Sequence, residues 1–335
     1  MSNPTDPAAP NPRRLFELAW GYAPPIIISA AIEHRVCDLL ASGPKTVEEV
    51  SAQNGASRRG LRILMNALVA LELLRKDAEG RYALTPESET FLVRGKPGYL
   101  GGFAQHGDKL IPKWVQLKEI VRTGKPAVTV DQEGDGTEFF EAFVEDLFPV
   151  GYPAAQALAA ALPGKKRILD LAAGSGVWSI PFAQLAPDVH VTAVDWPGVL
   201  RTTRKVTERC GVASQYEFRP GDLREAGFGS GYDVAALGQI LHSEGAERSR
   251  ALLGKTFRAL APGGTIAIAE FLANEDRSGP PMAMLFAVNM LVNTEEGDSF
   301  TMAEISGWLT EAGFVEPRAL EVPAPSPLIL ATKPK

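Results

Sequence analysis

A run of small residues between an apolar segment and a predicted helix is the first candidate binding site. Within the sequence ILDLAAGSG, the residues Ala172, Gly174 and Gly176 form a turn that a ligand can approach closely. We expect a strand to end before this turn and a helix to open at about Val177, so that unpaired backbone N–H groups face the ligand. Asp195 ends the next predicted strand about twenty residues later, where a carboxylate reaches ribose hydroxyls. The pattern indicates an adenosine-containing cofactor.

The glycine pattern leaves the class of this cofactor open. A dinucleotide fingerprint requires a third glycine, and Ser179 stands in its place. Asp222 and Leu223 follow the third predicted strand, where a carboxylate and an apolar side chain can hold an adenine ring, and Gln239 ends the fourth. An NAD-dependent oxidoreductase is therefore an alternative that the missing glycine disfavours.

A histidine follows the fourth predicted strand. His242, in the sequence QILHSE, lies at the carboxyl edge of the sheet, where ligands of open α/β sheets bind. An imidazole can accept a proton from a phenol near neutral pH. A lone histidine is more often a surface or core residue, but this position favours a catalytic role.

A helix late in the chain carries a second candidate surface. Phe286, Asn289, Met290 and Asn293 recur at i, i+3, i+4 and i+7 and share one helix face. Because buried asparagines need hydrogen-bond partners, we interpret this face as a wall of an acceptor pocket, with a plain core face as the alternative. Further candidates to close the pocket are Phe103, His106, Trp114, Phe148 and Tyr152.

Strands and helices alternate from residue 164 onward, which predicts a mainly parallel sheet. The tail holds two strand-like runs joined by a short proline-rich turn, so the last strand should be antiparallel. The expected strands are 167–172, 190–195, 216–221, 232–239, 264–271, 315–323 and 326–334.

The front of the chain predicts a mostly helical, winged-helix-like domain. A helix broken at Pro24 and Pro25 precedes a short helix capped by Thr46, a longer helix capped by Ser57, and a hairpin. The apolar run at residues 26–28 is typical of a dimer surface.

Three arginines at the start of the longer helix, Arg58, Arg59 and Arg62, invite a DNA-binding interpretation. They are few and lie near glutamates, so a solvated helix face is the preferred interpretation, with no nucleic-acid partner.

The composition fits a globular protein of two domains. The chain has 335 residues, of which 45% are hydrophobic and 22% charged, and a formal net charge of -6. Two distant cysteines, Cys37 and Cys210, predict neither a disulfide framework nor a structural metal site. The apolar run 23–32 is too short to span a bilayer. We expect a cytoplasmic protein without a membrane partner.

The order of these motifs resembles the class I S-adenosylmethionine (SAM)-dependent methyltransferases. Residues 14–335 resemble the two-domain small-molecule O-methyltransferases, which include plant caffeate-type, bacterial polyketide and phenazine, and bacteriochlorophyllide methyltransferases. The resemblance implies a Rossmann-like seven-stranded sheet, SAM as cofactor, a small-molecule methyl acceptor and a homodimer. The implied domains are a disordered tail (1–13), a winged-helix-like dimerisation domain (14–100), a helical connector and lid (101–163) and a SAM-binding catalytic domain (164–335).

The resemblance also implies roles for individual residues, with His242 as the catalytic base. The implied cofactor-binding residues are Asp170, Ala172, Gly174, Gly176, Asp195, Trp196, Asp222, Leu223 and Gln239.

One departure from the family pattern concerns the catalytic histidine. The family orients this imidazole with a glutamate, and Ser299 stands at that position, with Glu295, Glu296 and Asp298 as possible substitutes. Without a fixed carboxylate an imidazolium is less stabilised, so a thiol, thioether or carbon acceptor becomes credible. So does a SAM- or metabolite-responsive transcription regulator with an inactive catalytic half.

Overall fold

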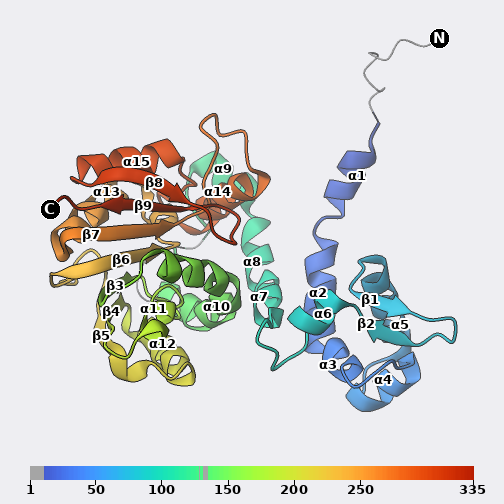
Figure 1. Cartoon of the computed structure of the whole chain (residues 1–335). Helices are drawn as coiled ribbons and strands as arrows, with labels where there is room; N and C mark the ends of the chain where they lie inside the picture. The colour runs from blue at the N-terminus through green and yellow to red at the C-terminus, as the bar shows by residue number, and fades with distance from the viewer. Residues whose placement is uncertain (1–10, 128, 131–134) are drawn as a thin grey trace, which may run out of the picture. The chain divides into compact units, whose positions relative to one another are not determined.

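The computed structural model describes residues 11–127, 129–130 and 135–335, and the chain forms two compact units, Met1–Lys109 and Leu110–Lys335 (Figure 1). Most of the predicted disordered tail, residues 1–10, lies outside the described residues. The first helix begins at Arg13.

The N-terminal unit has the predicted order of helices followed by a hairpin. Thr46 and Glu49 form the expected capping box, and Ser57 caps the longer helix. The elements are α1 (Arg13–Ala19), α2 (Ala23–Glu33), α3 (Val36–Leu40), α4 (Val47–Asn54), α5 (Arg58–Ala70), β1 (Leu74–Lys76), β2 (Tyr82–Leu84), α6 (Pro86–Phe91) and α7 (Gly101–Gln105).

The segment formed by α1 and α2 leaves large apolar side chains exposed. Leu15, Phe16 and Trp20 are each more than half exposed. By length and composition alone, Arg13–Glu33 passes a test for a membrane span, which is weak evidence for a segment near the N-terminus. Exposed apolar surface of this kind is typical of an interaction site.

The C-terminal unit is an α/β structure. Its elements, beginning with the helix in which the two units meet, are α8 (Gly107–Trp114), α9 (Leu117–Thr123), α10 (Asp135–Ala161), β3 (Arg167–Leu171), α11 (Ile180–Leu185), β4 (His190–Asp195), α12 (Pro197–Arg209), a 3₁₀ turn (Ala213–Gln215), β5 (Tyr216–Pro220), β6 (Tyr232–Gly238), α13 (Leu241–Ala259), β7 (Leu260–Ala269), α14 (Pro281–Asn293), α15 (Met302–Glu311), β8 (Val315–Leu320) and β9 (Leu328–Thr332).

Seven strands form one sheet in the order β5-β4-β3-β6-β7-β9-β8. Strands β3 to β7 pair in parallel and β9 pairs antiparallel with β7, which confirms the predicted Rossmann-like topology. The fifth strand of this sheet, β7, begins at Leu260 rather than after the Pro-Gly-Gly turn, because Leu260 already pairs with Tyr232 across a local register shift. The carboxyl ends of β3, β4, β6 and β7 meet at one edge.

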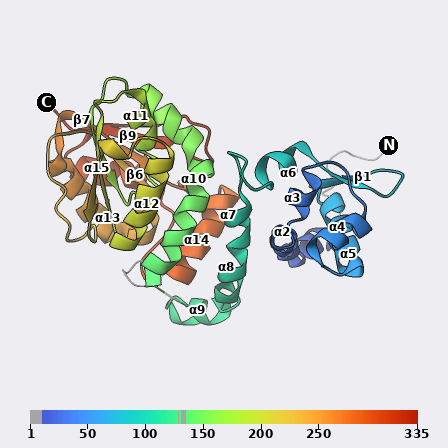
Figure 2. The same ribbon diagram turned by 90° about the horizontal axis from the view of Figure 1, so that it is seen from below.

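Helices cover both faces of the sheet. One core cluster joins the strands to α13 and α15, and another joins them to α10, α11 and α12. Figure 2 shows α10 running beside α12, with which it makes many contacts. The sequence suggests two helices over 139–162, but the structure has the single helix α10 with Pro149 and Pro153 inside it. Packing on α11 and α12 outweighs the local cost of the prolines.

Candidate active site

The turn after β3 has left-handed backbone at three positions. Ala172, Gly174 and Gly176 have φ angles of 52°, 54° and 78°. Helix α11 begins only at Ile180, not at about Val177 as predicted, because residues 177–179 form a turn in which the N–H groups of Ser179 and Ile180 both donate to the Gly176 carbonyl. A side chain at Gly176 would press on Thr203 at 3.3 Å, so the small residues of this turn also allow it to pack closely on α12.

Asp195 links this turn to the end of β4 by hydrogen bonds. One carboxylate oxygen accepts a hydrogen bond from the Gly174 N–H at 2.9 Å, and the other accepts from the Trp196 N–H at 2.7 Å. Burial raises the pKa of Asp195 to about 6, although both N–H donors act in the opposite direction. The structure therefore brings Asp195, Trp196 and the turn together.

Asp170 lies buried beneath the turn. One of its oxygens accepts a hydrogen bond from the Ser179 hydroxyl, which in turn lies 2.8 Å from the Tyr216 hydroxyl. Its other oxygen is buried and has no hydrogen-bond partner among the described residues. Burial raises the pKa of Asp170 to about 7, and the nearby Asp195 adds to the rise.

Asp222 follows β5 and is held by its own neighbour. The Arg224 guanidinium contacts both carboxylate oxygens, and the Arg224 N–H donates to one of them at 2.8 Å, so the pKa of Asp222 falls below its usual value. Lys255 supports this loop by donating to the Leu223 carbonyl at 2.7 Å. The Leu223 side chain packs against the core cluster under α13.

Gln239 begins the loop after β6 with a φ of 60°. Its N–H donates to the Ala269 carbonyl at 2.8 Å, which continues the pairing of β6 with β7. Its side-chain oxygen is buried and has no partner among the described residues. A donor from a ligand would satisfy this oxygen, and an unsatisfied one costs about 1–3 kcal/mol.

His242 lies in the first turn of α13 against a carboxylate that the sequence analysis missed. Its ring Nδ1 is 2.6 Å from Oε2 of Glu270, the residue directly after β7. The other Glu270 oxygen accepts from the N–H groups of Leu241 at 2.7 Å and His242 at 3.3 Å. Glu270 is 6% exposed, so solvent does not replace these contacts.

This contact fixes the tautomer of the imidazole. An ionised carboxylate only accepts hydrogen bonds, so Nδ1 of His242 carries the hydrogen. The lone pair then lies on Nε2, on the far side of the ring from Glu270. The expectation that His242 lacks an orienting carboxylate was wrong, because the supporting group comes from the end of the neighbouring strand.

The segment expected to supply that carboxylate contacts His242 through its backbone instead. The Asp298 N–H donates to the His242 carbonyl at 2.9 Å. Ser299 is buried and donates to the Ala283 carbonyl at 2.8 Å, while Glu295 and Glu296 are exposed. None of these four side chains is the group that orients the ring.

Helix α14 lies against the imidazole. The Phe286 ring meets the His242 ring edge-on, with centroids 4.7 Å apart, and contacts the Phe271 ring at 4.5 Å. Further along the same face, the Asn289 side-chain oxygen accepts from Trp114 Nε1 at 3.2 Å and from Asn293 Nδ2 at 3.1 Å. Both asparagines of this face therefore have hydrogen-bond partners within the chain, with Asn293 buried and Asn289 half-buried.

Two family models match the chain. That of the O-methyltransferase domain matches residues 114–315, and that of the O-methyltransferase dimerisation domain matches residues 16–94. The chain belongs to the SAM-dependent O-methyltransferase family.

Characterised relatives cover nearly the whole enzyme. It is 34% identical over 331 residues to the 3-hydroxy-5-methyl-1-naphthoate 3-O-methyltransferase of Streptomyces sahachiroi, covering 96% of this chain and 94% of the relative. It is 30% identical to the tetracenomycin polyketide synthesis 8-O-methyl transferase of Streptomyces glaucescens, covering 97% of each chain. The solved structure of human N-acetylserotonin methyltransferase with SAM matches with a TM-score of 0.85 at 26% identity, covering 100% of both chains.

The methyltransferase offers SAM a suitable set of groups at the sheet edge. Two buried oxygens beside the turn at 172–176, on Asp170 and Gln239, lack donors within the described residues. SAM carries ammonium and hydroxyl donors, so its chemistry fits these acceptors.

The family assignment settles the alternatives from the sequence. The NAD-dependent oxidoreductase is overturned by the match to the O-methyltransferase domain. The hypothesis of a transcription regulator with an inactive catalytic half depended on the absence of a carboxylate beside His242. Glu270 supplies that carboxylate.

The remaining pocket candidates of the methyltransferase separate into different places. Trp114 joins the α14 face through Asn289. Phe148 and Tyr152 stack on each other, and the Tyr152 hydroxyl donates to Gln184 on α11 at 2.6 Å, so both pack against the helical layer of the sheet. Phe103 and His106 belong to the N-terminal unit.

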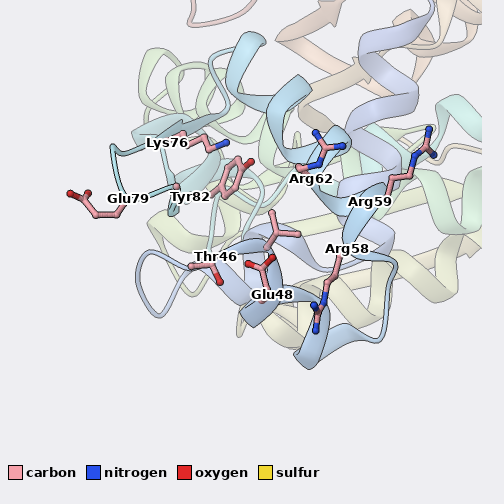
Figure 3. Close-up of a pocket in the computed structure, with 10 residues that line it drawn as sticks. Thr46, Glu48, Arg58, Arg59, Arg62, Lys76, Glu79 and Tyr82 are labelled. Carbon is pink, nitrogen blue, oxygen red and sulfur yellow. The ribbon is translucent and has the colours of Figure 1, made fainter.

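A separate pocket of about 510 Å³ lies in the N-terminal unit (Figure 3). Arg58, Arg59 and Arg62 line it, but Figure 3 shows their side chains pointing in different directions. Glu48 and Glu79 line the same pocket. Lys76 also lines it, so the pocket presents four basic and two acidic side chains.

Among the described residues, no group of three or more His, Cys, Asp or Glu side chains is placed to hold a metal ion. Both cysteines are free, and burial raises the pKa of the Cys37 thiol to about 12.

Proposed function

We propose that the enzyme transfers the methyl group of SAM to a hydroxyl group on an aromatic small molecule, with His242 as the proton acceptor. One observation carries the proposal: His242 Nδ1 lies 2.6 Å from the buried carboxylate of Glu270, which leaves Nε2 as the basic atom.

SAM supplies a methyl group on a sulfonium centre that is activated for in-line transfer to a nucleophile. The residues proposed to hold it line the edge where β3, β4, β5 and β6 end. They are Asp170, Ala172, Gly174, Gly176, Asp195, Trp196, Asp222, Leu223 and Gln239. Among them, Asp195 is proposed to bind the ribose hydroxyls, because its carboxylate already fixes the turn beside it.

The protein's own part in the reaction is to position the hydroxyl and to take its proton. Nε2 of His242 accepts the proton as the hydroxyl oxygen forms its bond to the methyl carbon. Glu270 then faces a positively charged imidazolium in a buried setting, where opposite charges attract strongly. Alignment of the reacting atoms supplies most of the rate.

The acceptor is proposed to be a fused aromatic compound that also carries a carbonyl or carboxylate oxygen. Phe271 and Phe286 offer ring faces beside His242. Trp114 Nε1 can only donate, so the Asn289 oxygen faces it and the Asn289 NH₂ group remains a donor for a ligand. Asn289 lies one helical turn, about 4.5 Å along the axis, from Phe286. Met290 and Asn293 complete the proposed wall.

The 3-hydroxy-5-methyl-1-naphthoate named for the Streptomyces sahachiroi relative is a fused aromatic compound with a hydroxyl and a carboxylate, and the Streptomyces glaucescens relative is named for polyketide synthesis. We propose an acceptor of the same chemical class for this enzyme.

The N-terminal domain, residues 14–100, is proposed to form a homodimer. The dimerisation-domain match covers the exposed apolar side chains of α1 and α2, so a second copy of the chain would cover them. With this apolar surface covered, we propose that the enzyme is soluble and cytoplasmic. Residues 101–163 are proposed to close over the acceptor, and residues 164–335 to bind SAM.

The proposal is tested by methyl transfer from isotope-labelled SAM to 3-hydroxy-1-naphthoate, with product identified by mass spectrometry. We expect one added methyl group on the hydroxyl and no product from 1-naphthoate, which lacks the hydroxyl. A second compound, 2-naphthol, lacks the carboxylate and tests whether the second oxygen is needed. The ester methyl 3-hydroxy-1-naphthoate keeps that oxygen without a charge and tests whether the charge is needed. SAM binding without transfer to any hydroxyarene would contradict the proposed acceptor class.

A further inference from the structure

The turn that carries His242 is separated from the rest of α13. Gly245 has φ 71° and ψ 174°, which are not helical angles, so the helix is interrupted three residues after His242. The regular hydrogen-bond ladder of the long helix cannot hold the first turn in place across this break. Side chains of the same helix reach back across the break, Ser249 to the Leu241 carbonyl at 3.2 Å and Arg248 to the Glu244 carbonyl at 2.8 Å, while the contact to the His242 carbonyl comes from another segment.

Segment 294–299 lies directly against this turn. The Asp298 N–H donates to the His242 carbonyl at 2.9 Å. A Cβ atom added at Gly245 would lie 2.7 Å from the Glu296 carbonyl oxygen, and one added at Gly297 would lie 2.5 Å from the His242 carbonyl oxygen. Backbone therefore meets backbone, and both glycines are needed for the close contact.

Arg277 holds segment 294–299 in place. Its Nη1 donates to the Asp298 carboxylate at 3.2 Å and to the Ser299 carbonyl at 2.8 Å. Its Nη2 donates to both oxygens of Glu304 at 2.8 and 2.9 Å. Glu304 also accepts from the Thr301 N–H in the capping box of α15. One guanidinium thus joins the loop after β7, segment 294–299 and the start of α15.

We propose that Arg277 is a positioning residue for methyl transfer, which acts by holding segment 294–299 against the backbone of His242. The order of contacts runs from Arg277 to Asp298 and Ser299, and from the Asp298 N–H to the His242 carbonyl. The orientation of the imidazole toward the acceptor depends on that last contact as well as on Glu270. This inference rests on the proposed role of His242 as the base.

The test is the substitution Arg277→Ala, with kcat, KM and SAM affinity measured separately. We expect kcat to fall about 10- to 100-fold, the size that a small misplacement of a reacting group produces. The dissociation constant for SAM should stay within about twofold, because the cofactor turn has no contact with Arg277. Added methylguanidinium should restore part of the lost kcat, which a general loss of stability would not allow.

Arg250→Ala is the matched control. Arg250 also pairs with a glutamate of α15, Glu311 at 3.1 Å, but it has no contact with segment 294–299. Its removal should leave kcat unchanged. An equal loss of kcat in both variants, or an unchanged kcat in Arg277→Ala, would overturn the proposal.

Arg277→Lys provides a variant that keeps the positive charge. A single ammonium cannot contact Asp298, Ser299 and Glu304 together, so an intermediate kcat is expected. Full activity in this variant would show that charge alone suffices and would refute the positioning role. His242→Gln tests the proposed function by itself: an unchanged kcat there would remove the base, whatever Arg277 does.

Discussion

The two halves of the candidate active site differ in how their buried polar groups are satisfied. At the His242 side, both oxygens of Glu270 have donors supplied by the chain itself. At the cofactor side, one oxygen of Asp170 and the side-chain oxygen of Gln239 have no donor among the described residues. The first region is complete without a ligand, and the second has acceptors left for one.

This difference shows what each region contributes. A proton acceptor must hold its geometry before substrate arrives, since any reorganisation during transfer adds to the barrier. A binding surface gains affinity when the ligand supplies hydrogen bonds that the free protein lacks. The same sheet edge therefore combines a His242–Glu270 pair whose carboxylate is fully hydrogen-bonded with a proposed cofactor turn that has unsatisfied acceptors beside it.

The largest effect is expected from Glu270→Gln, which changes the carboxylate beside His242. A single amide oxygen cannot replace both carboxylate oxygens, and it carries no charge to stabilise the imidazolium. We expect kcat to fall about 100- to 1000-fold, with SAM affinity unchanged in calorimetry. Substitution of the exposed Glu208 by Gln is the control. A loss of less than about threefold would show that Glu270 is dispensable.

A smaller effect should appear on the cofactor side when Asp170→Asn is compared with the parent across pH. The folded pKa of Asp170 is about 7 and its ordinary value is 3.8, so the folded protein holds this proton to higher pH than the unfolded chain. The free energy of unfolding should therefore fall as pH rises from about 4 to about 7. An asparagine does not titrate, so the free energy of unfolding of the variant lacks this pH dependence.

The free energy of unfolding of Asp170→Asn, relative to that of the parent, should rise from about pH 4 to about pH 7. The rise should reach roughly 2–4 kcal/mol before it levels off. Urea unfolding of both proteins at several pH values measures it. A difference that stays constant with pH would mean that Asp170 titrates normally.

The smallest expected effect is at Ala172, whose φ of 52° is costly for a residue with a side chain. Ala172→Gly should raise the free energy of unfolding by about 0.5–1 kcal/mol, since glycine adopts this conformation without strain. Thermal unfolding of the apo protein would detect it, with Ala155→Gly in α10 as a control that should be destabilised. A destabilised Ala172→Gly protein would contradict the inferred strain.

Most of the fold could be predicted because its signals are local. The small-residue turn before α11, the capping residues Thr46 and Ser57, and the strand pattern after residue 164 all appear where the sequence places them. The start of α11 could not be predicted, because the turn at residues 177–179 depends on hydrogen bonds to the Gly176 carbonyl. The single helix α10 depends on tertiary packing that outweighs two prolines.

The hydrogen-bond partner of His242 lies 28 residues away in the sequence but directly after the neighbouring strand of the sheet, so a pattern of nearby residues does not reveal it. The parallel pairing of β6 with β7 matches Gly238 with Ala269, so the residues after them lie side by side. Once the order of strands was predicted, the acidic residue after the fifth strand was the nearest candidate to a histidine after the fourth. Glu270 could have been found from that topology alone.

Strand β7 is paired on both edges, with β6 on one side and β9 on the other. Interior strands exchange their amide hydrogens only through large-scale opening, whereas strands such as β5, at the margin of the sheet, open locally. The carboxylate of Glu270 follows directly from one of the last segments to open. Gentle heating should therefore loosen the Asp222 loop, which follows β5, before it disturbs Glu270.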